Sequence, residues 1–353
     1  MNKKNIFLDL IRKESRFFPF EIKWKNIKID NVLQIHTIFS FLESNYIEDH
    51  TSTFRFNYIH EFINFVIKIP KSHPIFNVGM QFKRGKKLVG LITSVPKFII
   101  FDNFVINSSE INFLCIEKKI RSTRLVSILI EEVTRKLNLI GTIQALFTTA
   151  ISFLESFLVS RYYHYPINFL KLYQNNFLKT KMHFTRTDRF YKKNKRLKQK
   201  RKTEINAYEI YRRNLPKLRV YPCFMANDFC HWFKTVEGIF YVLFLSFKKK
   251  RKIKFTAVYS LPNKSMRGNK KVYIYCSYFY FSFLKINLKI VSKNIIKILE
   301  SLGFDLFNVL ACENEKTLMN EIGYKKGTGL LFFHLFNWNA RKLLTKDNGL
   351  ITF

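Results

Sequence analysis

A chain of 353 residues can bury a large core, and its length suggests two domains or one large double domain. Hydrophobic residues make up 47% and aromatic residues 17% of the chain, a composition that excludes an intrinsically disordered protein. The formal net charge of +36 raises the question of a basic nucleic-acid-binding protein, which stays an alternative, but the Lys and Arg residues are spread along the whole chain and we interpret them as compositional bias.

The first half of the chain shows an order of elements that recurs later. KLVGLITSVP (87–96) is a predicted strand that ends in Ser-apolar-Pro, and a second strand follows at 111–116. A helix at 124–138 and a strand within GTIQALFTTA (141–150) complete the unit. We expect the helix to bury one apolar stripe and to expose a polar face, the stripe being Leu125, Ile128, Leu129, Val133 and Leu137 and the polar face Glu131, Glu132, Arg135 and Lys136.

The second half repeats this order. IKFTAVYSLP (253–262) also ends in Ser-apolar-Pro, and an aromatic strand (273–281), a helix (292–302) and a strand within GFDLFNVLA (303–311) follow it. Gly141 and Gly303 come directly after the two helices, where left-handed C-caps are expected. The repeat predicts an α/β (α+β) fold made of two similar halves packed together.

The densest charge run, RFYKKNKRLKQKRK (189–202), separates the halves. We interpret it as a solvated linker or exposed hairpin, because aromatic residues are not interleaved along it. Contact with RNA, the ribosome or an anionic membrane surface is the alternative. The resulting division is an N-terminal half (1–185), a basic linker (186–202) and a C-terminal half (203–353).

The five cysteines, at 115, 223, 230, 276 and 312, include no CxxC pair, so we expect no disulfide framework and a reducing compartment. Cys223, Cys230 and His231 are followed by no second pair of ligands, and we predict no metal site. The N-terminal MNKKNIFLDLIRKESRFF lacks the long apolar core and cleavage site of a signal peptide. We therefore expect a cytoplasmic monomer without stable membrane insertion.

In EINFLCIEKKIRSTRL (110–125) an apolar strand runs directly into a basic turn and a helix. The first N–H groups of a helix have no intrahelical partners, and together with the helix dipole they form an anion site. Ser122, Thr123 and Arg124 occupy the positions that would face such an anion. The chain has no GxGxxG or P-loop, so the pattern suggests a pyrophosphate held by a βα turn, with coenzyme A as one obvious ligand. A basic helix start without a ligand explains it nearly as well.

EINFLC followed by RSTR resembles the signature of the N-myristoyltransferase family. Further blocks follow in the family's order: NYIEDHTSTFRFNY (45–58), KKLVGLITSVP (86–96), RYYHYPIN (161–168), GFDLFNVL (303–310), GTGLLFFHLFNW (327–338) and GLITF (349–353). The resemblance implies a compact, N-terminally shortened, divergent eukaryotic glycylpeptide N-tetradecanoyltransferase. It also implies two fused acetyltransferase-like (GNAT-type) halves with pseudo-twofold symmetry, the first holding the acyl-CoA and the second supplying much of the peptide groove.

The implied reaction is direct aminolysis of the thioester of myristoyl-CoA, a co-substrate, by the N-terminal glycine of peptides and nascent proteins. By resemblance, the backbone amides of Phe113 and Leu114 form the oxyanion hole, and the C-terminal carboxylate of Phe353 is the general base. Asn112 and Thr148 match family positions near the amine. No tightly bound cofactor and no metal are implied.

The resemblance also assigns the binding sites. The residues implied for acyl-CoA are Phe7, Leu8, Phe113, Leu114, Cys115, Ile116, Ser122, Thr123, Arg124, Leu125 and Val126. Those implied for the peptide are Tyr46, Ile47, Glu48, Asp49, Phe54, Phe56, Thr148, Tyr162, His164 and Ala257. We interpret Cys115 as a buried strand residue and not as an acyl-accepting nucleophile, because no His–Asp pair is placed beside it.

Some positions depart from the family pattern. Ala257 stands where a serine is common, and a longer acidic run is reduced to Glu48 and Asp49, which predicts a weaker preference for basic peptides. A catalytically degenerate relative that binds acyl-CoA or peptides without turnover is therefore a further alternative.

Overall fold

The structure, a computed structural model, describes residues 11–18, 21–46, 54–121, 124–152, 154–178, 202–214, 218–247, 252–265, 272–282, 288–311, 316–350 and 352. The first elements are β1 (Ile22–Asn26), α1 (Val32–Asn45), β2 (Phe54–Phe56), α2 (His60–Ile67), η2 (Pro74–Phe76), β3 (Asn77–Phe82), β4 (Leu88–Phe101), β5 (Phe104–Ile116), η3 (Lys118–Ile120), α3 (Leu125–Leu139), β6 (Gln144–Thr149), β7 (Leu158–Pro166) and α4 (Phe169–Gln174). The remaining elements are α5 (Lys202–Asn214), β8 (Val220–Pro222), α6 (Ala226–Trp232), β9 (Phe240–Phe247), β10 (Lys252–Ser260), β11 (Asn263–Ser265), β12 (Tyr273–Ile274), β13 (Cys276–Ser282), α7 (Leu288–Ser301), β14 (Leu306–Ala311), α8 (Lys316–Ile322), β15 (Lys325–Phe336) and η7 (Thr345–Asp347). None of the helices within these ranges is long and apolar enough to cross a membrane.

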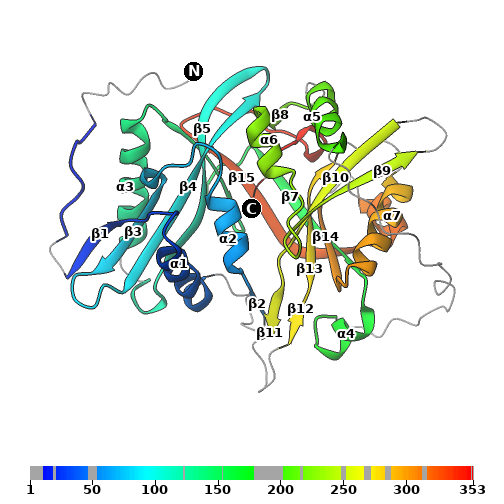
Figure 1. Cartoon of the computed structure of the whole chain (residues 1–353), viewed down its shortest axis with the longest axis horizontal. Helices are drawn as coiled ribbons and strands as arrows, with labels where there is room; N and C mark the ends of the chain where they lie inside the picture. The colour runs from blue at the N-terminus through cyan, green and yellow to red at the C-terminus, as the bar shows by residue number, and fades with distance from the viewer. Residues whose placement is uncertain are drawn as a thin grey trace.

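One large sheet runs through both halves of the molecule in the order β1-β3-β4-β5-β6-β15-β7-β14-β13-β10-β9, with β8 added to β4 (Figure 1). In the first half, β3, β4 and β5 are antiparallel, and β6 is parallel to β5 across helix α3. In the second half, β9, β10 and β13 are antiparallel, and β14 is parallel to β13 across helix α7. The α/β class and the two similar halves predicted from the repeated element order are thus confirmed.

The two halves exchange their last strands. β7 follows the first half in sequence but pairs along β14 of the second, from Pro166 opposite Leu306 to Arg161 opposite Ala311. β15 comes from the second half and pairs with β6 of the first, and it also pairs with β7. In Figure 1, β15 accordingly crosses the middle of the molecule between the two halves. The repeat in the sequence predicted two packed halves but not this exchange.

Most predicted elements lie at their expected positions. The strand expected at 111–116 is the end of β5, and the helix expected at 124–138 is α3. Gly141 and Gly303 have φ values of +76° and +83°, which confirms the left-handed C-caps. The expected aromatic strand is divided into β12 and β13. The basic run 189–202 lies outside the described residues except for Lys202, which begins α5.

Helices cover both faces of the first half of the sheet. A core cluster lies between the sheet and helices α1 and α2 and contains Leu91, Val95 and Phe113 of β4 and β5. On the other face, the predicted apolar stripe of α3 packs on Val89 and Ile92 of β4, in a second cluster. The sheet between these two clusters carries the candidate site.

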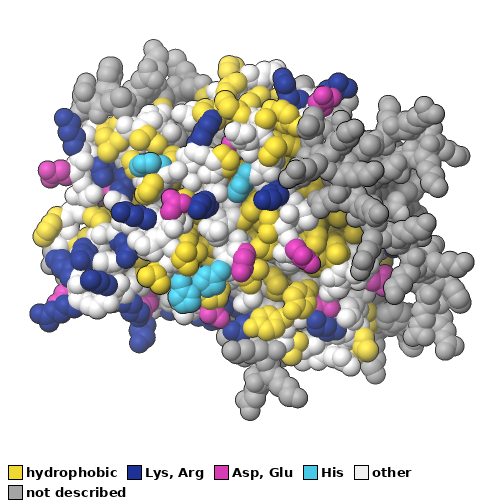
Figure 2. Space-filling view, in the orientation of Figure 1, with side chains coloured by type: hydrophobic (Ala, Val, Ile, Leu, Met, Phe, Trp, Pro, Cys, Tyr) yellow, Lys and Arg dark blue, Asp and Glu magenta, His cyan; other side chains and the backbone are white. Residues whose placement is uncertain are grey.

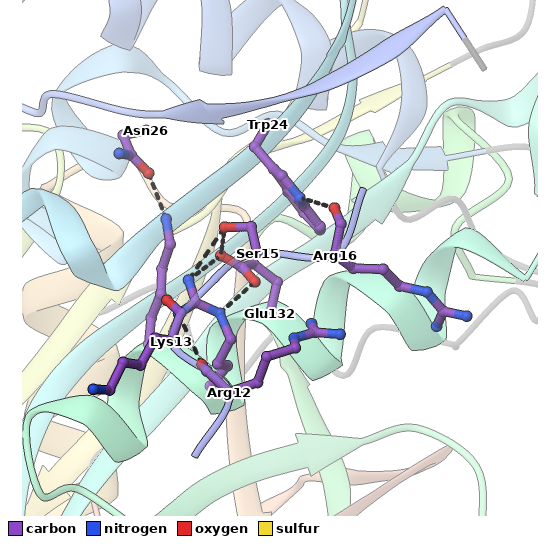
Figure 3. Close-up of polar contacts among 9 residues, drawn as sticks. Arg12, Lys13, Ser15, Arg16, Trp24, Asn26 and Glu132 are labelled. Carbon is purple, nitrogen blue, oxygen red and sulfur yellow. Dashed lines mark hydrogen bonds and ion pairs between the residues drawn. The ribbon is translucent and has the colours of Figure 1, made fainter. Parts of the chain in front are cut away.

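The polar face expected for α3 is wrong at two positions, because Glu132 and Lys136 are only 1% and 8% exposed. Figure 3 shows the N-terminal segment 12–16 lying along this face of the helix. Ser15 Oγ donates to Glu132 Oε1 (2.8 Å), and Arg135 Nη1 donates to the carbonyl oxygen of Lys13 (2.8 Å). The helical period alone could not reveal this cover, because it comes from a distant segment.

Candidate active site

A β-bulge interrupts β5 within the EINFLC block. The register pairs Leu91 with Cys115 and Thr93 with Asn112, so Phe113 and Leu114 together lie opposite the single residue Ile92 of β4. Phe113 has a φ of +50°, a left-handed conformation that a bulky residue adopts only when the surrounding structure imposes it. A bulge removes its extra residue from the regular ladder, and successive N–H groups beside a left-handed residue can form an anion-binding concavity.

The opposite edge of β5 opens at the same place. β5 pairs with β6 from Ser108 to Glu110, and the described pairing with β6 ends there. β6 continues toward β15, where Thr148 lies opposite Phe333. Asn112 and the bulge therefore lie beyond the last β5–β6 pair, at the point where the two parallel strands separate. A substrate group can approach the backbone of β5 between the strands at this position.

The connection from β5 to α3 carries the basic residues. Arg121 donates to the carbonyl oxygen of Ile116 (Nε–O 3.2 Å) and to that of Asn45. Asn45 Oδ1 accepts from the backbone N–H of Lys118 (3.1 Å), so the end of α1 fixes the turn. Arg124 is the N-cap of α3, and no acidic residue lies in the first turn of that helix. The described part of the turn thus places Arg121 and Arg124 beside the positive end of the helix dipole, an arrangement that favours an anion.

These cations belong to a larger basic face. Lys83, Arg84 and Lys86, in the β3–β4 turn, are exposed, and Lys87 forms an ion pair with Glu117 directly after β5. Figure 2 shows dark-blue side chains gathered at the lower left, where Figure 1 places this end of β1, β3 and β4. The whole region next to the start of α3 therefore favours an anionic ligand.

The side chains of the bulge region divide between two cores. Phe113 and Cys115 lie in the cluster under α1 and α2, whereas Leu114 and Ile116 lie in the cluster under α3 with Leu125 and Val126. Burial raises the pKa of the Cys115 thiol to about 11, although nearby Arg121 acts in the opposite direction. Cys115 is therefore a protonated thiol at neutral pH, which does not suit a nucleophile.

Aromatic side chains from both halves meet in front of the bulge. The ring of Phe113 lies 5.9 Å from that of Tyr46 and 5.5 Å from that of Tyr58, between ring centroids. The wall continues from Phe56 to Tyr278, whose ring centroids are 6.3 Å apart. β2, which carries Phe56, pairs with β11 of the second half and so fixes this contact.

Tyr278 extends the wall within the second half. Its ring centroid lies 6.4 Å from that of Tyr162 and 5.2 Å from that of Tyr259. Burial raises the pKa of Tyr162 to about 12, and it also raises the pKa values of Tyr46, Tyr58, Tyr259 and Tyr278. These phenols are neutral at pH 7 and each can donate one hydrogen bond. Sequence reasoning missed Tyr58, Tyr259 and Tyr278, although Tyr58 and Tyr259 lie inside quoted blocks.

His164 lies on β7 between strands of the second half. Its Nδ1 is 2.6 Å from Asn308 Oδ1, so Nδ1 carries the proton and donates. Burial lowers the pKa of His164, although the Asn308 hydrogen bond opposes this effect, and the ring is neutral at pH 7. A Cβ at position 327 would lie 2.3 Å from His164 Nε2, so the glycine of GTG is required for the strand to pass the imidazole. Ala257 is fully buried and packs in the same cluster as Phe113.

Several predicted site residues lie outside the described residues: Phe7, Leu8, Ile47, Glu48, Asp49, Ser122, Thr123 and Phe353. Phe54 is described by its backbone only, at the start of β2. The remaining predicted residues lie around the bulge, the basic turn and the aromatic wall.

Comparisons with known proteins identify the family of the chain. Residues 2–160 match the N-terminal domain, and residues 166–350 the C-terminal domain, of Myristoyl-CoA:protein N-myristoyltransferase. The two matches place the chain among the acyltransferases. More narrowly, the chain belongs to the N-myristoyltransferase family, as the resemblance in its sequence predicts.

Similar proteins come from several eukaryotes. The probable glycylpeptide N-tetradecanoyltransferase of Caenorhabditis elegans is 28% identical, over 99% of this chain and 80% of its own length. The glycylpeptide N-tetradecanoyltransferase of Plasmodium falciparum is also 28% identical, over 97% of this chain and 85% of its own. A crystal structure of Saccharomyces cerevisiae N-myristoyltransferase with bound myristoyl-CoA superposes with a TM-score of 0.88 at 26% identity, covering 99% of this chain and 89% of that one.

Proposed function

We propose that this protein transfers the myristoyl group of myristoyl-CoA to the N-terminal glycine amine of peptides and nascent proteins. The observation that carries the proposal is the bulge of β5, because it sets a left-handed Phe113 at the separation of two parallel strands, directly before a basic helix start. The family membership of the chain and the myristoyl-CoA bound by the similar yeast enzyme support the choice of acyl donor.

The chemistry is aminolysis of a thioester. The glycine amine attacks the carbonyl carbon, the carbon–sulfur bond breaks, and the amide product and the coenzyme A thiol are formed. Negative charge develops on the carbonyl oxygen, and the backbone N–H groups of Phe113 and Leu114 are the proposed donors to it. Removing one donor of this kind costs roughly 2.7–4 kcal/mol of transition-state stabilisation in other enzymes.

The amine must lose a proton before it attacks. An α-amino group has an ordinary pKa of about 7.7–8, so a weak base is sufficient. We assign this role to the terminal carboxylate of a chain that ends at Phe353, with Asn112 and Thr148 conducting the proton. The anchoring of the preceding tail supports the assignment, because the Gly349 N–H donates to Val220 O (2.7 Å) and Leu350 is only 7% exposed.

The peptide groove follows the aromatic wall. The neutral phenols offer hydrogen-bond donors without charge, and the neutral imidazole of His164, whose Nδ1–H is bonded to Asn308, offers Nε2 as an acceptor. The glycines of GTG let β15 lie close against two proposed peptide-site residues, since Gly327 contacts His164 and Gly329 contacts Tyr162.

The test is a thiol-release assay with myristoyl-CoA and an N-terminal glycine peptide, with mass spectrometry of the product. We expect a peptide that carries one myristoyl group, and a loss of at least about a hundredfold in kcat, or roughly 2.7 kcal/mol, when Phe353 is deleted. Tight binding of myristoyl-CoA without any product would contradict the proposal and identify a degenerate binding relative. Full activity after the deletion would contradict only the assignment of the base.

A further inference from the structure

We infer that Thr93 is a positioning residue for the oxyanion donors of β5, an inference that rests on the proposed function. Thr93 lies on β4, has no exposed surface, and faces Asn112 across the ladder. Its Oγ1 donates a hydrogen bond to the backbone carbonyl oxygen of Asn112 (3.1 Å). This carbonyl belongs to the same peptide unit as the N–H of Phe113, the first proposed donor.

The geometry of one peptide unit connects the two groups. The described chain has no cis peptide bond, and in a trans unit the carbonyl and the N–H point in opposite directions. The carbonyl of Asn112 is directed toward Thr93 on β4, so the N–H of Phe113 is directed away from β4. That is the side on which β5 has separated from β6, where the substrate carbonyl is expected. The hydroxyl of Thr93 therefore fixes the plane that aims the donor.

The backbone at Phe113 needs a hydrogen bond of this kind to hold its conformation. A bulky residue with a φ of +50° persists only when neighbouring contacts hold it, and a bulge has lost part of its ladder. A hydrogen bond accepted by a carbonyl also polarises its peptide unit and strengthens the N–H as a donor, by about 10–30% per bond. The Thr93 bond thus acts on both the direction and the strength of the donor.

Two other buried hydroxyls in the same ladder make bonds of the same kind. Ser109 Oγ donates to Val95 O (3.0 Å), and Ser108 Oγ donates to Lys97 O (2.6 Å). Both acceptors lie on β4, in peptide units remote from the bulge. Ser109 has no exposed surface, like Thr93, and so provides a matched control for the loss of one ladder hydroxyl.

The experiment compares the full-length wild-type chain with Thr93→Val, Thr93→Ser and Ser109→Ala. We expect Thr93→Val to lower kcat about tenfold, less than the 10²–10³-fold that follows loss of a whole donor, because its N–H remains but is no longer fixed. The KM values for myristoyl-CoA and peptide should stay within about twofold, since the donor gains most of its interaction as negative charge develops on the carbonyl oxygen. Thr93→Ser keeps the hydroxyl and should restore kcat, and Ser109→Ala should leave kcat unchanged. Thr93→Ala replaces Thr93→Val if the latter does not fold.

A second readout does not depend on turnover. Infrared spectroscopy of bound myristoyl-CoA, ¹³C-labelled at the thioester carbonyl, reports how strongly that carbonyl is polarised. We expect a shift to lower frequency in wild type and in Thr93→Ser, and a smaller shift in Thr93→Val. Equal kcat and equal shifts in all four proteins, with only stability reduced, would overturn the inference and leave Thr93 a purely structural residue. If wild type binds the acyl-CoA without forming product, the proposed function fails while the infrared comparison still decides the role of Thr93.

Discussion

The buried ion pair between Lys97 and Glu110 allows a quantitative prediction about stability. The two residues join β4 to β5 three positions before the bulge, and their side chains are only 4% and 2% exposed. Replacing Lys97→Met keeps most of the side-chain length but leaves the Glu110 carboxylate in the interior without that cation. Breaking a buried pair on one side costs about 3–5 kcal/mol, and no discount for solvent screening applies at this depth.

The double variant Lys97→Met/Glu110→Leu should behave differently. It removes both charges and both desolvation costs, and replacements of this kind are often neutral or stabilising by about 1–4 kcal/mol. We therefore expect each single variant to unfold at a clearly lower urea concentration than wild type, and the double variant to unfold close to it. The coupling between the two positions should be close to the sum of the two single losses, because each single variant strands a charge that the other substitution removes.

Urea unfolding followed by tryptophan fluorescence at pH 7 measures these differences. Lys68→Met is the matched control, because Lys68 forms its ion pair with Asp30 at side-chain exposures of 50% and 80%. An exposed pair contributes about 0–1 kcal/mol, so this identical substitution should have little effect. The reasoning would be refuted if Lys97→Met and Lys68→Met lost similar stability, or if the double variant lost the sum of the two single losses.

Three further predictions follow from other features of the chain. Asn77 is fully buried, and neither of its side-chain amide atoms has a hydrogen-bond partner among the residues that the structure describes. Asn77→Leu should therefore stabilise the protein by about 1–3 kcal/mol in the same urea assay, and a loss of stability would contradict this. Burial raises the pKa of Cys115 to about 11, so at pH 8 only about one thiol in a thousand is ionised. Iodoacetamide should therefore label the exposed Cys223 first and Cys115 only after unfolding. Mass spectrometry of tryptic peptides would test this order. The sequence resemblance predicts an acidic run reduced to Glu48 and Asp49, so a lysine in the peptide should improve kcat/KM by less than about tenfold, or roughly 1.4 kcal/mol. A peptide panel that gave a stronger preference would disprove this.

Local patterns in the sequence predicted the elements that carry the site. The apolar run 111–116 and the amphipathic stretch after it correspond to the end of β5 and to α3. The glycines after the two helices predicted left-handed C-caps, which Gly141 and Gly303 confirm. These predictions succeeded because each depends on residues close together in the chain: an apolar period, a breaker residue or a charge at a helix start.

The bulge could not be predicted in the same way. Phenylalanine is unfavourable at a φ of +50°, so no local preference marks Phe113 as left-handed. Only its position opposite Ile92, which depends on the pairing of two strands, produces this conformation. The burial of Glu132 has a similar cause, since residues 12–16 cover it from a distant part of the chain.

The aromatic wall required knowledge of the tertiary structure. Tyr58 and Tyr278 belong to opposite halves, and the pairing of β2 with β11 brings the two regions together. A chain with 17 tyrosines gives no reason to select these two from composition. The blocks that resemble the N-myristoyltransferase family identified Tyr46, Phe56 and Tyr162 because a family pattern already contains information about contacts between distant segments.

The exchanged strands also set a delay in the assembly of the protein during synthesis. Thr149 Oγ1 of β6 and His334 Nε2 of β15 lie 2.9 Å apart although 185 positions separate them in the chain. At a translation rate of about 5–20 residues per second, β6 waits roughly 10–40 s for its neighbour, and until then its edge is unpaired. β15 is also the strand that lies between β6 and β7 in the sheet. The two parts of the sheet therefore cannot join, next to the point where β5 and β6 separate, before nearly the whole chain has been made. The unpaired edge of β6 is a site of aggregation risk in the nascent protein, and a ribosome-bound fragment that stops before residue 325 contains the bulge of β5 without the strand that pairs with β6.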